Sequence, residues 1–528
     1  MEEKGYLLLV LNTHLPFIRH PEIEHPFEEN WLFEAIVESY LPLITVCEDL
    51  IRAGDDFKIS FALSPSLIAM LTDDLLQQRF LHYLEDRIGL SQKEMERLRH
   101  EPQLFALALT YHQRFVASRR VFQERWNTDL TSAFSYLLDS GKVEIIPSAA
   151  THAYLPLWEL FPRMIRLQIQ LGILQFRDVF GRDPLGFWLP ECGFFPGLDA
   201  LLQSEGIRYF FLDAHGLLNG DPSPKFGEYA PIHCPSGVAA FGRDWQSHDL
   251  VWLKDKGYPG DPFYRDFDED IGFELEPDYL LPFTHSPQRV PTGMKYFRAG
   301  ANGPGQVYDP MRALSRCDEH ANHFIDSCQQ QVEYLHSRLG RKPVIAALFD
   351  TEHFGHWWHE GPAWLNLVLR KLSHGQKTIK LITARDYLES HPINQIVSPS
   401  MSSWGYQGYS ETWLMGRNHW IYPALYEMIE LIDQLVESNT GSEGSRRDAL
   451  NQYFRELLLA QSSDWAFMMH AQSSQVYAEK RVTEHIQNMM NIYHQIMQNR
   501  IDSEALDLIR KKNNIFSKVD ILELYRKI

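Results

Sequence analysis

The stretch Trp188-Leu-Pro-Glu-Cys-Gly-Phe194 follows the apolar residues Gly186 and Phe187 and places one carboxylate, Glu191, between a proline and a glycine. An apolar, aromatic run that ends in proline and glycine is typical of a strand that stops at a loop. A carboxylate held there by packed neighbours is partly screened from water, and acids acquire catalytic roles in such environments. An exposed acid at a strand end is the alternative, and this stretch alone does not decide between the two.

Other apolar runs of the chain end in similar polar side chains. The run 6–11 is followed by Asn12 and His14, and the run 142–146 by His152. The run 343–349 is followed by Asp350, Glu352, His353 and His356. Because the carboxyl ends of parallel strands line one mouth of a barrel, we expect these side chains to converge with Glu191. Each cluster alone is weak evidence, since a lone histidine at a strand end, such as His152 or His215, is often structural.

Strand patterns alternate with helical patterns from the start of the chain. Helical spacing over 28–52 separates the first run from a second at 58–63, and the runs at 142–146, 186–189 and 209–213 are separated by helical segments at 163–180 and 197–206. This alternation favours an α/β fold with a parallel sheet. Two stretches interrupt it. The stretch 67–138 is almost free of strand signals, with helical periodicity broken near Gly89 and Pro102, and 219–278 is rich in Gly, Pro and Asp, with strand character only at 237–241 and 250–252. Loops of that length are usually lids or binding loops.

The last part of the chain is helical. A long helix at 310–339 precedes the buried strand at 343–349, and amphipathic helices follow at 422–437, 447–460 and 477–499, with an exposed link at 437–447. The sequence therefore predicts a barrel domain over 1–395, with a helical insertion at about 67–138 and an active-site loop region at about 219–278. A helical domain is expected over 396–528.

Composition narrows the class of partner. The chain has 528 residues and a net charge of −19, which argues against nucleic acid, because a polyanion needs a basic surface. Aromatic residues make up 13% of the chain, and Trp and Tyr rings suit the apolar faces of sugars. Five cysteines without a Cys-x-x-Cys pair, and an acidic N-terminus without a signal-peptide pattern, favour the reducing cytoplasm and no membrane association.

Glu191 and Asp350 form the pair of carboxylates that suggests a reaction. In retaining glycoside chemistry one carboxylate attacks the anomeric carbon and the other protonates the leaving oxygen, with the pair roughly 5–5.5 Å apart. The histidines at 353, 356 and 359 suggest a metal site instead. Their spacing is not that of a zinc helix, and aromatic residues lie between them, so we expect no metal and no cofactor.

Four long motifs carry a resemblance to a known family. They are Trp188-Leu-Pro-Glu-Cys-Gly-Phe194, Phe349-Asp-Thr-Glu-His-Phe-Gly-His-Trp-Trp-His-Glu-Gly-Pro362, Ser402-Ser-Trp-Gly-Tyr-Gln-Gly-Tyr409 and Gln461-Ser-Ser-Asp-Trp-Ala-Phe467. Together with Asn12-Thr-His-Leu-Pro16 and Trp31-Leu-Phe-Glu-Ala-Ile36, they resemble glycoside hydrolase family 57. The similarity covers nearly the full chain and is closest to the 1,4-α-glucan branching enzymes of that family.

The resemblance implies an incomplete seven-stranded (β/α) barrel with helical insertions, a C-terminal all-helical domain, and retaining transfer of α-1,4-glucan chains to a 6-hydroxyl. Glu191 would be the nucleophile and Asp350 the general acid/base. Trp404 and Trp413 would be glucan platforms, and His14 and His152 would contact the sugar. The full set of expected substrate-binding residues is Asn12, His14, His152, Trp188, His353, His356, Trp357, Trp404, Trp413 and Asp464. A loop within about Phe241 to Phe267 would cover the site.

Two departures from the family pattern keep alternatives open. The first motif usually has His-x-His, whereas this chain has Asn12 before Thr13 and His14, and no tyrosine of the covering loop matches the family's. An α-amylase or 4-α-glucanotransferase on the same scaffold, a glucan-binding homologue of weak activity and a metal-dependent polysaccharide deacetylase are the rival functions. The partner is expected to be amylose, amylopectin or glycogen, and the oligomeric state is not predicted.

Overall fold

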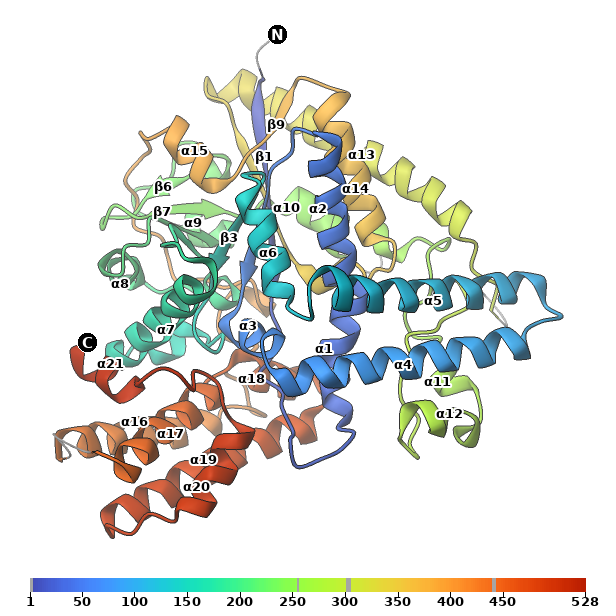
Figure 1. The fold of residues 1–528 in the computed structure, drawn as a ribbon. Coiled ribbons are helices and arrows are strands. Elements are labelled where there is room, and N and C mark those ends of the chain that lie inside the picture. Colours follow the sequence, from blue (N-terminus) through green and yellow to red (C-terminus); the bar gives the residue numbers. More distant parts are fainter. Residues whose placement is uncertain (1–2, 254–255, 301–304, 439–442) are drawn as a thin grey trace.

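A barrel of parallel strands forms the centre of the protein, with helices around it and a group of C-terminal helices below it in the view of Figure 1. The computed structural model describes residues 3–253, 256–300, 305–438 and 443–528. The strands are β1 (Gly5–Thr13), β2 (Ile59–Leu63), β3 (Val143–Pro147), β4 (Gly186–Phe187), β5 (Tyr209–Leu212), β6 (Ile232–His233), β7 (Ala239–Gly242), β8 (Val344–Asp350) and β9 (Ile379–Leu381).

Parallel strands follow one another around the barrel in the order β3, β2, β1, β8 in one sheet and β4, β5, β7 in the other. A parallel bridge from Ser148 to Trp188 joins the sheets at β3 and β4. At the other seam the backbone N–H of Asp244, just after β7, donates to the carbonyl of Ala346 in β8 over 2.8 Å. Seven of the described strands thus make an incompletely closed barrel, with β9 parallel beside β1 and β6 antiparallel beside β7.

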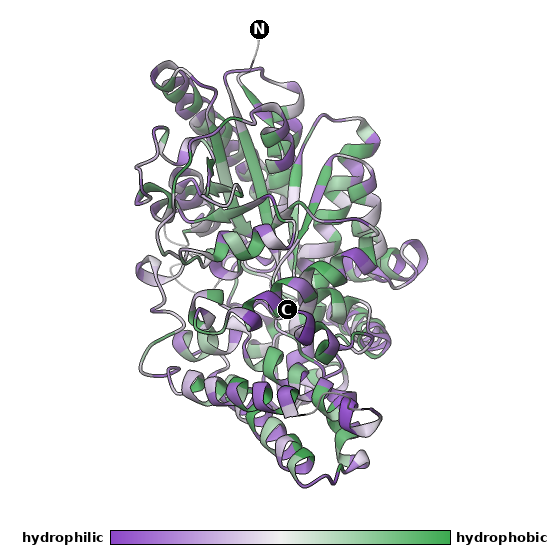
Figure 2. Cartoon of the chain, turned by 90° about the vertical axis from the view of Figure 1, so that its left-hand side faces the viewer, coloured by the Kyte–Doolittle hydropathy of each residue, from purple (hydrophilic) through white to green (hydrophobic). Residues whose placement is uncertain are grey.

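The alternation of side chains along β1 explains why its sequence is apolar without interruption. Leu8 and Val10 pack inside the barrel with residues of β7 and β8, whereas Leu7 and Leu9 belong to the larger core shared with the outer helices. Because both faces are covered, both must be apolar, as is usual for parallel strands. Figure 2 shows the same arrangement, with apolar strands at the centre and helices that are polar on one side.

Helices surround the strands, and those expected at 28–52, 67–138, 163–180, 197–206 and 310–339 are among them. Before β8 they are α1 (Asn30–Ala35), α2 (Leu41–Ala53), α3 (Pro65–Leu71), α4 (Asp74–Arg97), α5 (Pro102–Arg120), α6 (Leu130–Asp139), α7 (Pro162–Phe180), α8 (Leu198–Ser204), α9 (Ala214–Leu218), α10 (Trp245–Trp252), α11 (Ile271–Glu274), α12 (Pro277–Thr284) and α13 (Pro310–Leu339). A π-helical turn, Ile36–Tyr40, joins α1 to α2, and another, Val121–Arg125, follows α5. The long helices α4 and α5 lie side by side and project from the barrel (Figure 1).

The segment 250–252 was predicted to have strand character, and this prediction is wrong, because it is the end of α10. The Asp244 side chain caps that helix by accepting from the backbone N–H of Ser247 over 2.7 Å. Val251 is fully buried, whereas Trp252 is partly exposed. A run of three apolar residues is too short for its periodicity to distinguish a strand from a helix end.

After β8 the chain is mainly helical: α14 (Gly361–His374), α15 (Ala384–Ser390), α16 (Ile421–Ser438), α17 (Ser445–Ala460), α18 (Ser463–Ala471), α19 (Gln475–Met497), α20 (Ser503–Lys512) and α21 (Ile521–Lys527). The predicted link at 437–447 includes residues 439–442, which lie outside the described residues. Within the described chain, none of the helices is both long and apolar enough to cross a membrane.

The segment between α15 and α16 is hydrogen-bonded to the barrel side of the molecule. Isolated bridges join Ile396 to His233, Ser398 to Asp221, and Ser402 to Phe194, which lies just beyond Glu191. This pairing carries the aromatic loop after Ser402 to the end of β4. The domain limits at 395 and 396 stay a prediction.

Candidate active site

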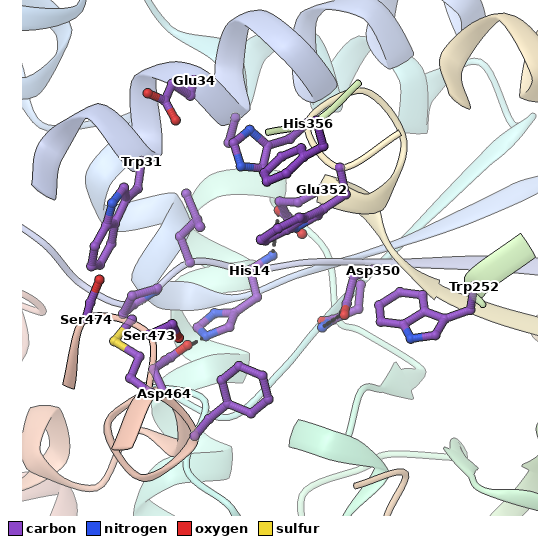
Figure 3. Close-up of a pocket in the computed structure, with 18 of the residues that line it drawn as sticks. His14, Trp31, Glu34, Trp252, Asp350, Glu352, His356, Asp464, Ser473 and Ser474 are labelled. Carbon is purple, nitrogen blue, oxygen red and sulfur yellow. Dashed lines mark hydrogen bonds and ion pairs between the residues drawn. The ribbon is translucent and has the colours of Figure 1, made fainter. Parts of the chain in front are cut away.

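A cavity of about 940 Å³ lies at the carboxyl ends of the barrel strands. Its walls come from strand ends, from the region 243–295, from the loop 404–413 and from α18 with the residues after it. Figure 3 shows part of this lining, with His14 and Asp350 at strand ends and Asp464 approaching from α18. Both predicted catalytic carboxylates, Glu191 and Asp350, line the cavity.

Glu191 is held in a short turn, Pro190–Cys192, that follows β4. Its backbone is left-handed, with φ 61° and ψ 19°, a conformation that non-glycine residues rarely adopt outside tight turns and sites under constraint. Both carboxylate oxygens accept hydrogen bonds of 2.8 Å, Oε2 from the indole N–H of Trp404 and Oε1 from the hydroxyl of Ser463. The backbone N–H of Trp404 also donates to the Glu191 carbonyl over 2.9 Å. Two segments distant in sequence therefore fix the orientation of this carboxylate.

Asp350 is the last residue of β8, and the strand register sets it opposite Asn12 of β1. The Asn12 amide donates to Asp350 Oδ1 over 2.9 Å. Trp252, at the end of α10, lies beside Asp350 in Figure 3 and stacks on His353 at 4.9 Å between ring centroids. Asp350 therefore has one amide donor, and Trp252 lines the same cavity.

Burial raises the pKa of both Glu191 and Asp350 above the ordinary range of carboxylic acids. Neighbouring buried carboxyls titrate as a pair, and near neutral pH such a pair tends to retain a proton. Hydrogen bonds to a carboxylate favour its ionised form, and Glu191 accepts two whereas Asp350 accepts one from Asn12. The donor arrangement therefore favours an ionised Glu191 and a proton on Asp350.

Two stacked histidines lie next to Glu191. The rings of His14 and His152 are 3.7 Å apart and nearly parallel. Since the Ser463 hydroxyl donates to Glu191, the 3.1 Å contact between that hydroxyl and His152 Nδ1 requires the ring N–H to be the donor. Burial holds the pKa of His152 well below its usual value, so Nε2 is an acceptor, and it has no hydrogen-bond partner among the described residues. A buried, unpaired acceptor that lines the cavity suits a sugar hydroxyl.

His14 links the strand end to the C-terminal helices. Its Nε2 is 3.0 Å from Asp464 Oδ2, and its Nδ1 is 2.8 Å from the hydroxyl of Ser64. Burial alone would raise the pKa of Asp464, but the neighbouring His14 lowers it below the usual value. Asp464 is therefore ionised and holds the His14 ring in the cavity wall.

A second acidic group lies farther along the cavity, near α1. Burial raises the pKa of Glu34 to about 7, and its Oε1 has no hydrogen-bond partner among the described residues. Glu38 is also buried, but its 2.6 Å contact with His356 Nδ1 lowers its pKa to about 2. Glu352 accepts from the Tyr40 hydroxyl over 2.5 Å, and burial raises its pKa to about 8. Polar groups thus extend along the cavity beyond Glu191 and Asp350.

Comparison with known proteins matches two parts of the chain to known families. Residues 8–400 match the family described as Glycosyl hydrolase family 57, and residues 421–523 match the one described as 1,4-alpha-glucan branching enzyme, C-terminal. The chain belongs to glycoside hydrolase family 57.

Similar relatives cover almost the whole length of this family 57 enzyme. A 1,4-alpha-glucan branching enzyme of Thermococcus kodakarensis is 30% identical over 98% of this chain and 78% of its own length. The crystal structure of the alpha-amylase AmyC from Thermotoga maritima has a TM-score of 0.92 at 37% identity, covering 99% of each chain. That of a branching enzyme from Pyrococcus horikoshii has a TM-score of 0.88 at 31% identity, covering 99% of this chain and 97% of the other. The predicted family and fold class are confirmed.

Most of the residues predicted to bind substrate in this family 57 enzyme line the cavity: Asn12, His14, His152, His356, Trp357, Trp404 and Asp464. Trp357 is 56% exposed and stacks on Phe267 at 4.7 Å, so its ring is available to a ligand. The loop predicted to cover the site, 241–267, contributes Trp252 and Phe267 to the lining, and its residues 254–255 lie outside the described ones.

Three of the predicted binding residues have buried side chains. Trp188 is fully buried and its ring meets Trp404 edge-on at 5.2 Å. His353 is buried, with Nε2 2.8 Å from the carbonyl of Val251. Trp413 borders the cavity, but it is 1% exposed and stacks on Tyr154. Little of these three side chains is open to a ligand, and their expected role in substrate binding stays a prediction.

The histidines that follow β8 do not meet at one point. His356 contacts Glu38, and His359 Nδ1 lies 3.4 Å from Arg114. Over the described ranges, no group of three or more His, Cys, Asp or Glu side chains is placed to hold a metal ion.

Several site residues were missed by the sequence reasoning: Trp31, Glu34, Glu38, Tyr40, Arg243, Trp252 and Ser463. Ser463 lies next to Asp464 in the motif 461–467, and a small hydroxyl beside an acid gives no signal of its own. Arg243 directly follows strand β7, and that position could have indicated it.

Proposed function

We propose that this protein is a retaining α-glucan enzyme, and specifically a 1,4-α-glucan branching enzyme that transfers α-1,4-linked segments to a 6-hydroxyl. The observation that carries the chemistry is the pair Glu191 and Asp350 in one cavity, with two donors on the first carboxylate and one amide donor on the second. The names of the branching-enzyme relatives and the match to the branching-enzyme C-terminal family support the specific reaction.

In the first step, Glu191 attacks the anomeric carbon while Asp350 gives its proton to the glycosidic oxygen. The bond to the leaving chain breaks, that chain departs with a new 4-hydroxyl, and a glycosyl ester forms on Glu191. The hydrogen-bond donors support these roles, since the carboxyl that accepts more hydrogen bonds is the one that must be ionised.

In the second step, Asp350 acts as the base. It takes the proton of an incoming 6-hydroxyl, whose oxygen attacks the anomeric carbon and releases Glu191. Water can take the place of that hydroxyl, and the products are then hydrolytic. Branching, disproportionation and hydrolysis therefore share both carboxylates and differ in which oxygen reaches the ester.

Trp252 supports transfer over hydrolysis. Its ring lies beside Asp350 in Figure 3, from the loop region expected to cover the site. We propose that Trp252 shields the glycosyl ester from water and so takes the place of the family's loop tyrosine. An apolar ring next to the base reduces the number of water molecules that can reach the ester.

An α-amylase is the second candidate. The overall likeness to the alpha-amylase of Thermotoga maritima, at 37% identity and a TM-score of 0.92, favours it.

We place the branching reaction in glycogen-type synthesis in the cytoplasm, with amylose, amylopectin or glycogen as substrate. The unpaired, buried state of all five cysteine thiols is compatible with that compartment.

The experiment is incubation of purified protein with amylose, followed by separate counts of new α-1,6 linkages and new reducing ends. Branching predicts that α-1,6 linkages form at a rate well above that of reducing ends. Reducing ends without branches would replace this proposal with the amylase. The Glu191→Gln protein, incubated in parallel, is the control for contaminating amylase.

A further inference from the structure

A second cavity adjoins the first. It measures about 530 Å³, within the usual size range of ligand sites, and shares with the catalytic cavity the residues Arg243, His248, Trp404 and Gly405. Its remaining walls come from the end of β5, from α9, from the start of α10 and from the turn after Trp404. The catalytic mechanism above uses none of the residues that belong to it alone.

The aromatic lining of this second cavity is exposed. Trp245 is 53% exposed and Tyr409 is 42% exposed. The indole N–H of Trp245 donates to Asp213 Oδ1 over 3.2 Å, and the Tyr409 ring meets His215 edge-on at 5.6 Å. Exposed rings that are fixed by neighbours are suitable stacking surfaces for sugars, because little side-chain entropy is lost on binding.

The charges of the cavity suit a neutral ligand. Arg243 is its one permanent cation among the described residues, and its guanidinium is bonded to Asp213. His215 Nδ1 lies 3.0 Å from the same carboxylate. Asp249 adds a largely exposed negative charge. With its cation neutralised, the cavity lacks the excess positive charge that a phosphorylated ligand would need, whereas amide, hydroxyl and acid groups suit sugar hydroxyls.

One rigid turn forms the partition between the cavities. Trp404 and Gly405 line both cavities, Tyr406 lines the first, and Gln407, Gly408 and Tyr409 line the second. A Cβ on Gly405 would lie 2.6 Å from the Trp413 ring, and one on Gly408, where φ is +84°, would lie 2.8 Å from the His215 ring. His215 Nε2 also contacts the Gly408 carbonyl at 2.7 Å. Trp413 on one side and His215 on the other therefore hold this turn in place.

The position of the partition connects the second cavity to the reaction. Trp404 donates to Glu191 at 2.8 Å, so a ligand that passes this ring approaches the glycosyl ester. Branching requires two glucan chains, a donor that is cleaved and an acceptor that supplies the hydroxyl. We propose that the second cavity binds the acceptor α-glucan, with Trp245 and Tyr409 as its stacking surfaces and His215 as a positioning residue for the partition. This inference rests on the proposed transferase function.

The test uses two separate substrates: unlabelled amylose as donor, and a short maltooligosaccharide, fluorescent at its reducing end and too short to be cleaved, as acceptor. Extension of the label measures transfer whichever hydroxyl accepts, and new reducing ends measure hydrolysis. For Trp245→Ala/Tyr409→Ala we expect the KM for the acceptor to rise about tenfold or more, as for loss of an aromatic hot spot, with the hydrolysis rate retained. Trp245→Phe, which keeps a ring, should recover most of the acceptor affinity.

Tyr334→Ala is the matched control, since Tyr334 is an exposed aromatic residue of α13, is 61% exposed and lines neither cavity. It should leave the acceptor KM unchanged. Thermal unfolding of each variant checks that it is folded. Acceptor binding to the Glu191→Gln protein, measured with and without the Trp245→Ala/Tyr409→Ala change, gives a readout independent of turnover.

An unchanged acceptor KM in the folded double variant would overturn the inference, as would an equal fall of hydrolysis and transfer, because that would assign the cavity to the donor. If the wild-type protein forms reducing ends and never extends the label, the proposed transferase function fails and this inference fails with it. That case is distinguished by the behaviour of the wild type alone.

Discussion

Replacing Trp404 with phenylalanine removes one hydrogen bond from Glu191 and keeps an aromatic ring in the partition. The lost bond is the 2.8 Å contact from the indole N–H to Oε2, on a carboxylate whose side chain is only 16% exposed. Hydrogen bonds to charged groups contribute about 1.5–3 kcal/mol. Since about 1.4 kcal/mol corresponds to one pKa unit, the pKa of Glu191 should rise by roughly one to two units.

The sign of the effect on activity follows from the role of Glu191. A donor stabilises the ionised carboxylate, so removal of the donor favours the protonated form, which cannot attack. The acid limb of kcat/KM should therefore move to higher pH by about one to two units. The plateau of kcat/KM should fall as well. In a larger fraction of the molecules the shared proton lies on Glu191 and Asp350 is ionised, and that protonation state is inactive.

The assay is the initial rate of cleavage of a chromogenic maltooligosaccharide, measured from about pH 4 to about pH 9, which reports the pKa values of the free enzyme through kcat/KM. Trp364→Phe is the matched control, since Trp364 is fully buried away from the cavity and its indole N–H has no hydrogen-bond partner among the described residues. This substitution should lower thermal stability and leave the acid limb of kcat/KM at the same pH. An acid limb and a plateau both unchanged in folded Trp404→Phe would refute the reasoning about Glu191.

Three further outcomes are expected. Glu191→Gln should lower all turnover by about 10⁴-fold or more in a protein that melts like the wild type, and substantial residual activity would remove Glu191 from the nucleophile role. Asp350→Asn should lose activity on amylose yet retain glycosyl-enzyme formation from a maltosyl fluoride, because fluoride departs without a proton; loss of both would contradict its role as the acid. Trp252→Ala should raise the ratio of new reducing ends to new branches, as measured on amylose, and an unchanged ratio would show that this ring does not exclude water.

Much of the barrel could be predicted from the chain because its signals are local. The uninterrupted apolar run in β1 requires cover on both faces, and proline or polar residues mark where β2, β4 and β8 end. The carboxyl ends of such strands converge in a barrel, so Glu191 and Asp350 could be paired from the sequence. The short helix α10 was missed, since three apolar residues do not define a period.

The supporting contacts depend on side chains distant in sequence. Trp404 and Ser463 reach Glu191 across 213 and 272 residues, and Asp464 reaches His14 across 450. Nothing in the chemistry of a tryptophan or a serine indicates which carboxylate it will meet. The same holds for the exposure of the aromatic rings, since Trp357 is 56% exposed while Trp188 and Trp413 are buried against Trp404 and Tyr154.

The sequence alone determined the chemical components of this protein: a parallel barrel, two carboxylates at strand ends, an aromatic surplus and a helical C-terminal part. Local patterns of apolar and polar residues are sufficient for that, because they fix which segments are buried. Only the tertiary structure decided which donors hold Glu191, which rings face a ligand, and that a second cavity meets the first at Trp404. Those features depend on packing between distant segments, and no local pattern encodes that packing.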